Sequence, residues 1–162
     1  NITTWLSELA FAPVDLHPEA PADEWSGDLG VGAQYFSQQA VARLLPASGI
    51  EYDASLSMPE QLKIVQKLME AGDERALKIY DAIGIYLGYT LAHYAEFYEF
   101  QYVLLLGRVT TGPGGEHIIT RSKEVMAAEF PELAAQIKFH FPDETEKRHG
   151  QAIAAASLPK IG

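Results

Sequence analysis

Three long stretches of the chain carry apolar residues at steps of three and four, the spacing that predicts helices with one buried face. They span residues 34–45, 57–72 and 73–94. The second has the clearest start, because Ser57 in the N-cap position is followed three residues later by Glu60, the pairing of a capping box. The third is apolar round much of its circumference, so we expect it to be largely buried.

Two glycines and a histidine lie on the third predicted helix. Gly84 and Gly88 are four residues apart and so share one helix face. Each costs up to about 1 kcal/mol relative to alanine, and we expect them to permit close packing against a neighbouring element. His93 follows on the same helix, where the pattern favours a polar group of the core over a metal ligand.

The rest of the chain combines short strands with helical spacing. Residues 8–14 and 137–141 predict short strands, and 102–106 form a continuous apolar run typical of a parallel strand covered on both faces. The remaining predicted elements are a loop over 112–115, a helix over 118–130 and a last helix over 144–156. This order of helices and strands predicts an α/β protein with a parallel component.

The composition of the chain narrows the classes of partner. A formal net charge of -10, with 12 scattered Lys and Arg residues among 162, argues against direct binding of nucleic acid. No uninterrupted apolar run approaches the roughly 20 residues that span a bilayer, so no membrane partner is expected. The chain has no Cys, which excludes disulfides, thiolate nucleophiles and Cys-based zinc sites and favours a cytoplasmic location.

Four blocks follow one another along the chain: residues 7–11 (SELAF), 24–33 (EWSGDLGVGA) with Ser37, 102–109 (YVLLLGRV) and 150–156 (GQAIAAA). In glycine pattern and order they resemble the ROK family of bacterial sugar kinases and repressors. The resemblance implies a ribonuclease-H-like α/β fold, the lobe of actin-like ATPases, in which helices flank a mixed sheet. It also implies that residues 1–162 form a single C-terminal lobe of a longer protein.

The same resemblance makes residues 1–33 an irregular, degenerate zinc and sugar loop. The family's zinc ligands fall at Phe11, Glu24, Ser26 and Val31. Neither Phe nor Val can donate a lone pair, so no zinc is expected, and a hydrophobic contact between Phe11 and Val31 is the predicted replacement. Of the sugar-contacting positions only Glu8 keeps a group that accepts hydrogen bonds from a substrate, and a merely solvated Glu is the alternative.

The residues after the apolar run at 102–106 are the predicted nucleotide site. The resemblance puts Gly107 where the backbone approaches adenosine, although a glycine that ends a strand also serves as an ordinary turn residue. Arg108 stands where the family has Gly, and its side chain either fills the adenine position, stacks on a purine or is structural. Thr110 and the glycines after it either line phosphates or form a surface loop, since no Lys follows in a P-loop arrangement.

The implied function is transfer of a phosphoryl group from ATP, with Mg²⁺, to a sugar hydroxyl by a full-length ROK-like carbohydrate kinase. The family's catalytic base and phosphate loop have no match in this chain, so we expect the 162 residues alone to be inactive. A noncatalytic ROK-like domain for ligand sensing or dimerisation is the alternative. Most aromatic residues between Tyr86 and Tyr102 are expected in the core, with Tyr98 a candidate for a homodimer interface.

Overall fold

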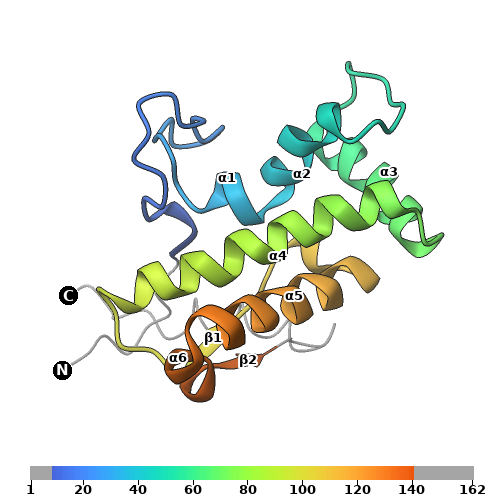
Figure 1. Ribbon diagram of the computed structural model, residues 1–162. Coiled ribbons are helices and arrows are strands. Elements are labelled where there is room, and N and C mark those ends of the chain that lie inside the picture. Colours follow the sequence, from blue (N-terminus) through green and yellow to red (C-terminus); the bar gives the residue numbers. More distant parts are fainter. Residues whose placement is uncertain (1–8, 141–162) are drawn as a thin grey trace, which may run out of the picture.

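The long helix α4 (Glu74–Ala95) crosses the molecule, and most of the other helices pack along its length (Figure 1). This computed structural model describes residues 9–140. Its further helices are α1 (Ala33–Phe36), α2 (Gln38–Leu44), α3 (Met58–Glu70), α5 (Pro113–Glu129) and α6 (Pro131–Gln136). The strands are β1 (Tyr102–Leu104) and β2 (Lys138–His140), and three short 3₁₀ turns are η1 (Leu9–Phe11), η2 (Leu45–Ala47) and η3 (Arg108–Thr110).

Helices α4 and α5 form the central contact of the fold and run in the same direction (Figure 1). A methyl group at Gly84 would lie 2.6 Å from the Cβ of Arg121, and one at Gly88 would lie 2.9 Å from the Cβ of Val125. Both distances are too short for real carbon atoms, so only glycine allows the two helix backbones to approach this closely. The predicted role of the two glycines is confirmed.

The two strands lie next to each other and are parallel, as the predicted α/β arrangement requires. Tyr102 pairs with Lys138 and Leu104 with His140, and helix α5 makes the crossover between the strands. The prediction that the first strand is covered on both faces is wrong, because the Tyr102 side chain is 67% exposed. Within residues 9–140 the fold is therefore helix-rich with a two-stranded parallel sheet, which is compatible with the α/β class.

Two predicted helices begin or end at other residues than the pattern indicated. The stretch 34–45 is broken at Ser37, whose side chain accepts a hydrogen bond from the backbone of Gln39 and thereby caps α2. Residues 112–115 are only partly a loop, because α5 already begins at Pro113, a residue whose fixed φ suits the first turn of a helix.

The first described segment is irregular, so the predicted strand over 8–14 is wrong for residues 9–14. Leu9–Phe11 form η1, and Pro13 then makes an isolated antiparallel bridge to Val31. A second bridge joins Ala22 to Leu29 and closes a long loop before α1. The predicted helix over 144–156 lies outside the described residues.

The core lies between α4 and the helices around it. Its largest fully buried side chains include Tyr80, Leu45 and Leu62, and Tyr94 is also buried. His93 is exposed, so its predicted place in the core is wrong: the helix turns it away from the buried face that holds Tyr94.

The prediction that most aromatic residues between Tyr86 and Tyr102 lie in the core is wrong, because Tyr89, Phe97 and Tyr102 are exposed and only Tyr94 is buried. Tyr98 is 47% exposed, and its place in an interface stays a prediction. No helix among the described residues is both long and apolar enough to cross a membrane.

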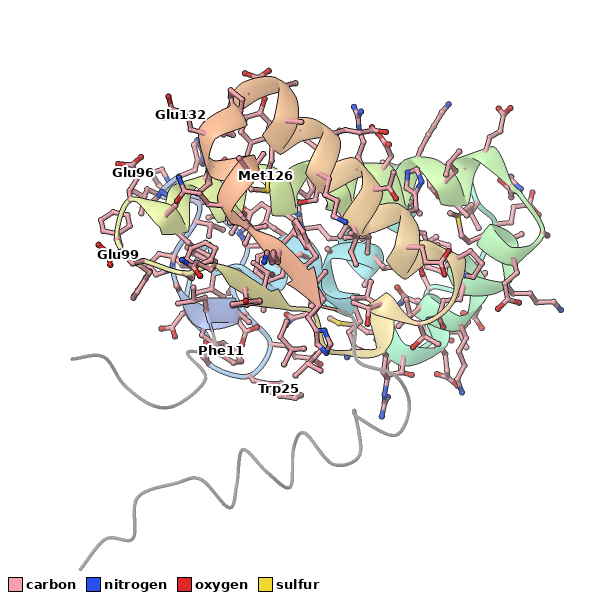
Figure 2. All side chains as sticks on the ribbon, turned by 90° about the horizontal axis from the view of Figure 1, so that it is seen from below. Phe11, Trp25, Glu96, Glu99, Met126 and Glu132 are labelled. Carbon is pink, nitrogen blue, oxygen red and sulfur yellow. The ribbon has the colours of Figure 1, made fainter. Side chains whose placement is uncertain are left out.

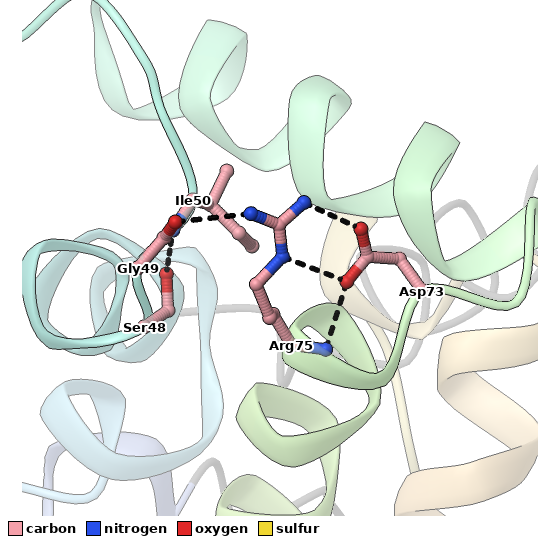
Figure 3. A network of polar contacts seen from close by, with 5 residues as sticks. All are labelled: Ser48, Gly49, Ile50, Asp73 and Arg75. Atoms are coloured by element: carbon pink, nitrogen blue, oxygen red, sulfur yellow. Dashed lines mark hydrogen bonds and ion pairs between the residues drawn. The ribbon is translucent and has the colours of Figure 1, made fainter.

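The N-termini of α3 and α4 are held by side chains. Ser57 and Glu60 form the predicted capping box at α3, which is confirmed. At α4, the carboxylate of Asp73 accepts hydrogen bonds from the backbone and the guanidinium of Arg75 (Figure 3). The same guanidinium donates to the carbonyl of Gly49, 3.0 Å away, and so ties the turn after η2 to the start of α4.

We expect Gly84→Ala to lower the free energy of unfolding by about 1–3 kcal/mol, the usual cost of overpacking a well-packed core. The gain in helix propensity, up to about 1 kcal/mol, offsets only part of this. Urea unfolding measures the change. Ala82→Gly on the same helix serves as the control and should cost no more than about 1 kcal/mol. Stabilisation by Gly84→Ala would show that the two backbones are farther apart than described here.

We expect Asp73→Asn to lower the melting temperature near neutral pH and to have less effect in acid. Hydrogen bonds from the side chain and then the backbone of Arg75 lower the pKa of Asp73 from 3.8 to about 2. A lowered pKa stabilises the fold fully above 3.8, and this contribution is lost as the pH falls from there through about 2. Asn still caps a helix, so the variant isolates the charge.

Thermal melts of both proteins across that pH range test this expectation. Glu19→Gln, which removes an exposed carboxylate from the loop before α1, is the control. A difference between wild type and Asp73→Asn that is constant from neutral to acidic pH would contradict the assigned pKa.

Candidate functional site

The turn after β1 is the part of the described structure that best fits a ligand-binding backbone. Gly107 has φ 110° and ψ 164°, a conformation essentially reserved for glycine. Nothing lies within 4 Å of the position that a Cβ would take there. The backbone at Gly107 is therefore open to close approach by another group, as the nucleotide site predicted from the sequence requires.

Thr110 shapes this turn through its side chain. Its hydroxyl donates a hydrogen bond of 2.7 Å to the carbonyl of Gly107, and its backbone N–H donates to the same oxygen. The residue is only 4% exposed. Thr110 therefore lies at the predicted site, but its hydroxyl donates its proton within the turn and not to a ligand. This hydrogen bond fixes the backbone around Gly107.

Arg108 lies at the surface beside Gly107. Its carbonyl accepts a hydrogen bond of 2.9 Å from the side chain of Gln66, which ties the turn to α3. Within residues 9–140 its guanidinium makes no hydrogen bond or ion pair, so it is able to stack on or pair with a ligand. Gln66 was not a candidate from sequence, because a single Gln on a helix carries no signal of a long-range contact.

Helix α5 begins at the far side of the same turn. Gly112 is the N-cap with φ 73°, and Gly114 packs directly on the ring of Tyr80, where a methyl group would lie 2.4 Å from ring carbons. The first turn of a helix leaves N–H groups without helical partners and carries partial positive charge. The start of α5 lies at the same edge of the molecule as the open glycine, but its first residue, Pro113, has no N–H, and the N–H of Gly115 is bonded to the carbonyl of Gly112.

Tyr80 is the residue near this turn that sequence reasoning missed. Its hydroxyl is buried and has no hydrogen-bond partner in the described structure. Burial, and to a lesser degree the charge of Glu70, raises the pKa of Tyr80 to about 12, so the hydroxyl stays protonated at physiological pH. A helical apolar pattern predicts a buried Tyr but not which element its hydroxyl faces.

The loop that the sequence predicted to be a degenerate zinc site spans residues 9–33 of the described structure. No group of three or more His, Asp or Glu side chains gathers there. Val31 is buried and Phe11 is 39% exposed, and the direct contact predicted between them stays a prediction. Figure 2 shows Phe11 and Trp25 on the same side of the molecule, with Trp25 pointing outward. Glu8 lies outside the described residues.

Hydrogen bonds to polar side chains hold this loop. The carboxylate of Asp23 accepts from the backbone N–H groups of Ser26 and Trp25 and from the side chain of Gln39 on α2. These bonds, that from Ser26 first, lower the pKa of Asp23 below its usual value. At the other side of the loop, the hydroxyl of Tyr35 donates to Asp15. The loop is thus anchored on the first two helices by polar contacts.

No family model matches the chain, and neither a curated protein nor a solved structure matches it. The ROK resemblance therefore stays a prediction.

We expect Gly107→Ala to lower the free energy of unfolding by about 1–3 kcal/mol, the cost of forcing a side chain into such a backbone conformation. No atom lies within 4 Å of the added methyl group, so the loss of stability comes from backbone strain and not from a steric clash. Gly72→Ala is the matched control, because Gly72 has φ 75° and equally open surroundings but the milder left-handed helical conformation. Chemical denaturation should show a larger loss for Gly107→Ala, and equal losses would contradict the special geometry of this turn.

Proposed function

We propose that this chain is the nucleotide-side lobe of a ROK-like carbohydrate kinase with a ribonuclease-H-like fold. The observation that carries the proposal is the open backbone at Gly107, at the carboxyl end of the parallel strand β1 and beside the start of α5. Ligands of open α/β sheets bind outside the carboxyl ends of the strands, and phosphates favour helix N-termini. The arrangement supports a bound nucleotide at this edge.

Each residue of the proposed site then has a distinct role. Gly107 gives the backbone room to approach adenosine, Thr110 fixes the turn, and the guanidinium of Arg108 reaches either the base or a phosphate. Mg²⁺ would come with ATP, because this ion is held largely through substrate phosphates. Glu70 is the carboxylate that adds to the electrostatic environment of Tyr80 near this turn.

Phosphoryl transfer to a sugar would need groups beyond those of this turn. The proposed reaction requires a base that takes the proton of the sugar hydroxyl and a loop that holds the γ-phosphate. In the proposed cytoplasmic kinase these come from the rest of the full-length protein, and Glu8 would accept hydrogen bonds from the sugar. The lobe alone positions nucleotide without turning it over.

A noncatalytic lobe for ligand sensing or homodimer formation is the second candidate. It is favoured by exposed aromatic side chains near the end of α4 and the start of β1. They are Phe97, Tyr98 and Tyr102, which are 70%, 47% and 67% exposed. Exposed aromatic groups of this size are typical of interfaces between proteins. In such a protein the turn at Gly107 would bind a regulatory ligand or none.

Calorimetric titration of the chain with Mg²⁺–ATP tests the proposal. We expect binding, and a loss of about tenfold in affinity for Gly107→Ala, because the added methyl group fills the open space against the ligand. Lys78→Ala, which removes an exposed charge from α4, is the control and should bind as the wild type does. Absence of binding by the wild type would refute a nucleotide site in this lobe.

A phosphorylation assay of the full-length protein with a panel of sugars separates the two candidates. Turnover dependent on ATP and Mg²⁺ supports the kinase. Binding of nucleotide without turnover of any sugar supports the noncatalytic lobe.

A further inference from the structure

A groove of about 740 Å³ lies at the end of the molecule where α4, α5 and α6 meet. Its walls include carboxylates and aromatic rings from all three helices or the residues that join them. The members that matter here are Tyr89, His93, Glu96, Glu129, Phe130 and Glu132, and we call this surface the acidic groove. It lies away from Gly107, because it gathers at the last turns of α4 and α5 and not at the first.

The direction of the two long helices makes this end of the molecule electronegative. Gly84 and Gly88 of α4 contact successive turns of α5, and Tyr89 then contacts Phe130, so the helices are parallel. Parallel helices bring their C-terminal carbonyl groups to the same end, where each macrodipole carries partial negative charge. The two C-terminal ends lie at the same end of the molecule (Figure 1), and residues of both line the acidic groove.

Three carboxylates add full charges at the same place. Glu96 is the C-cap of α4, Glu129 is the last residue of α5 and Glu132 lies in the first turn of α6. No Lys or Arg of the described chain lines the groove. Figure 2 shows Glu96 and Glu132 at the same end of the molecule.

Two of these carboxylates occupy positions that helices disfavour. Negative charge is unfavourable at a helix C-terminus, where Lys or Arg is the stabilising choice. Glu96 and Glu129 both lie at such ends, and the last turn of α5 contains no basic residue, whereas that of α4 contains His93 and Glu129 also directly precedes the N-cap of α6. A partner that brings positive charge would relieve this repulsion, so the arrangement favours binding over stability of the free chain.

The aromatic walls fit the uncharged part of a basic side chain. Tyr89 is 47% exposed and meets Phe130 edge to face, with ring centroids 5.8 Å apart. The rings of His93 and Phe97 form a second such pair beside it, 5.3 Å apart. The methylene stems of Lys and Arg pack on apolar surface while their cationic heads reach carboxylates, and aromatic faces attract the same cations.

We propose that the acidic groove docks a basic, amphipathic segment of a partner protein. Its apolar side packs against Tyr89 and Phe130, and its Lys or Arg side chains pair with Glu96, Glu129 and Glu132. Charge selects this occupant: a second copy of a chain with net charge -10, an anionic lipid surface and a nucleic acid would each be repelled. The inference is independent of the nucleotide site proposed above.

Fluorescence anisotropy with a labelled peptide of Lys and Leu, about 14 residues long and thus roughly four helical turns, tests the proposal. We expect the wild-type chain to bind this probe and not a peptide of the same pattern with Glu in place of Lys. The triple variant Glu96→Gln, Glu129→Gln, Glu132→Gln should weaken binding about tenfold, the expected sum of three partly exposed charge pairs. Peptide binding by this variant should also depend less on salt concentration than binding by the wild-type chain does.

A matched control separates docking from general attraction between opposite charges. Glu19→Gln, Asp28→Asn, Glu51→Gln removes the same charge from exposed positions on other parts of the chain and should change binding less than about twofold. Tyr89→Ala should weaken binding severalfold without changing its salt dependence, because it removes apolar contact only. The groove triple variant should fold, since two of its three changes remove a disfavoured charge from a helix end.

Three outcomes would overturn the proposal. The first is equal weakening by the two triple variants, which would show nonspecific attraction. The second is undetectable binding of the Lys–Leu peptide by the wild-type chain. The third is binding of spermine to the groove as tight as that of the peptide, which would make the site one for small cations.

Discussion

The close contact between α4 and α5 is the constraint on which the rest of the structure depends. Gly84 and Gly88 let the two backbones meet, and the contact fixes both their spacing and their register along each other. The start of α5 is thereby set against Tyr80, next to the turn at Gly107. Its end is set beside Glu96, and the two candidate surfaces of the molecule therefore follow from one packing arrangement.

The parallel direction of these helices has an electrostatic consequence. In an antiparallel pair the two macrodipoles oppose each other, whereas in a parallel pair the ends of like charge come together. The β1–α5–β2 crossover enforces the parallel arrangement, because β1 leads from the end of α4 back to the start of α5. One end of the pair therefore suits an anion and the other a cation, and the proposed nucleotide turn and the acidic groove lie at these opposite ends.

The sequence predicted the elements whose signals are local. Spacing of three and four residues and the Ser57 cap gave the long helices, and the glycine pair indicated their close packing. It could not show that Ser37 would cap a new helix, because a serine inside an amphipathic pattern is usually tolerated. The apolar run at 102–106 also could not show which of its faces other elements cover. The strand forms as predicted, yet Tyr102 is exposed. Long-range contacts such as Gln66 to Arg108 leave no pattern in the sequence.

The two-stranded sheet is only partly covered by the rest of the described structure. Parallel strands are normally buried on both faces, and an isolated pair needs further strands or a helix packed against it to be stable. Among residues 9–140 only β1 and β2 pair as strands, and Tyr102 and Leu106 leave apolar surface uncovered beside them. In the ribonuclease-H-like lobe proposed above, further strands would pair with the edges of this sheet and helices would cover its open face. Such a sheet would also hold β1 more rigidly, and with it the backbone at Gly107, whose usefulness to a ligand depends on being fixed before the ligand arrives.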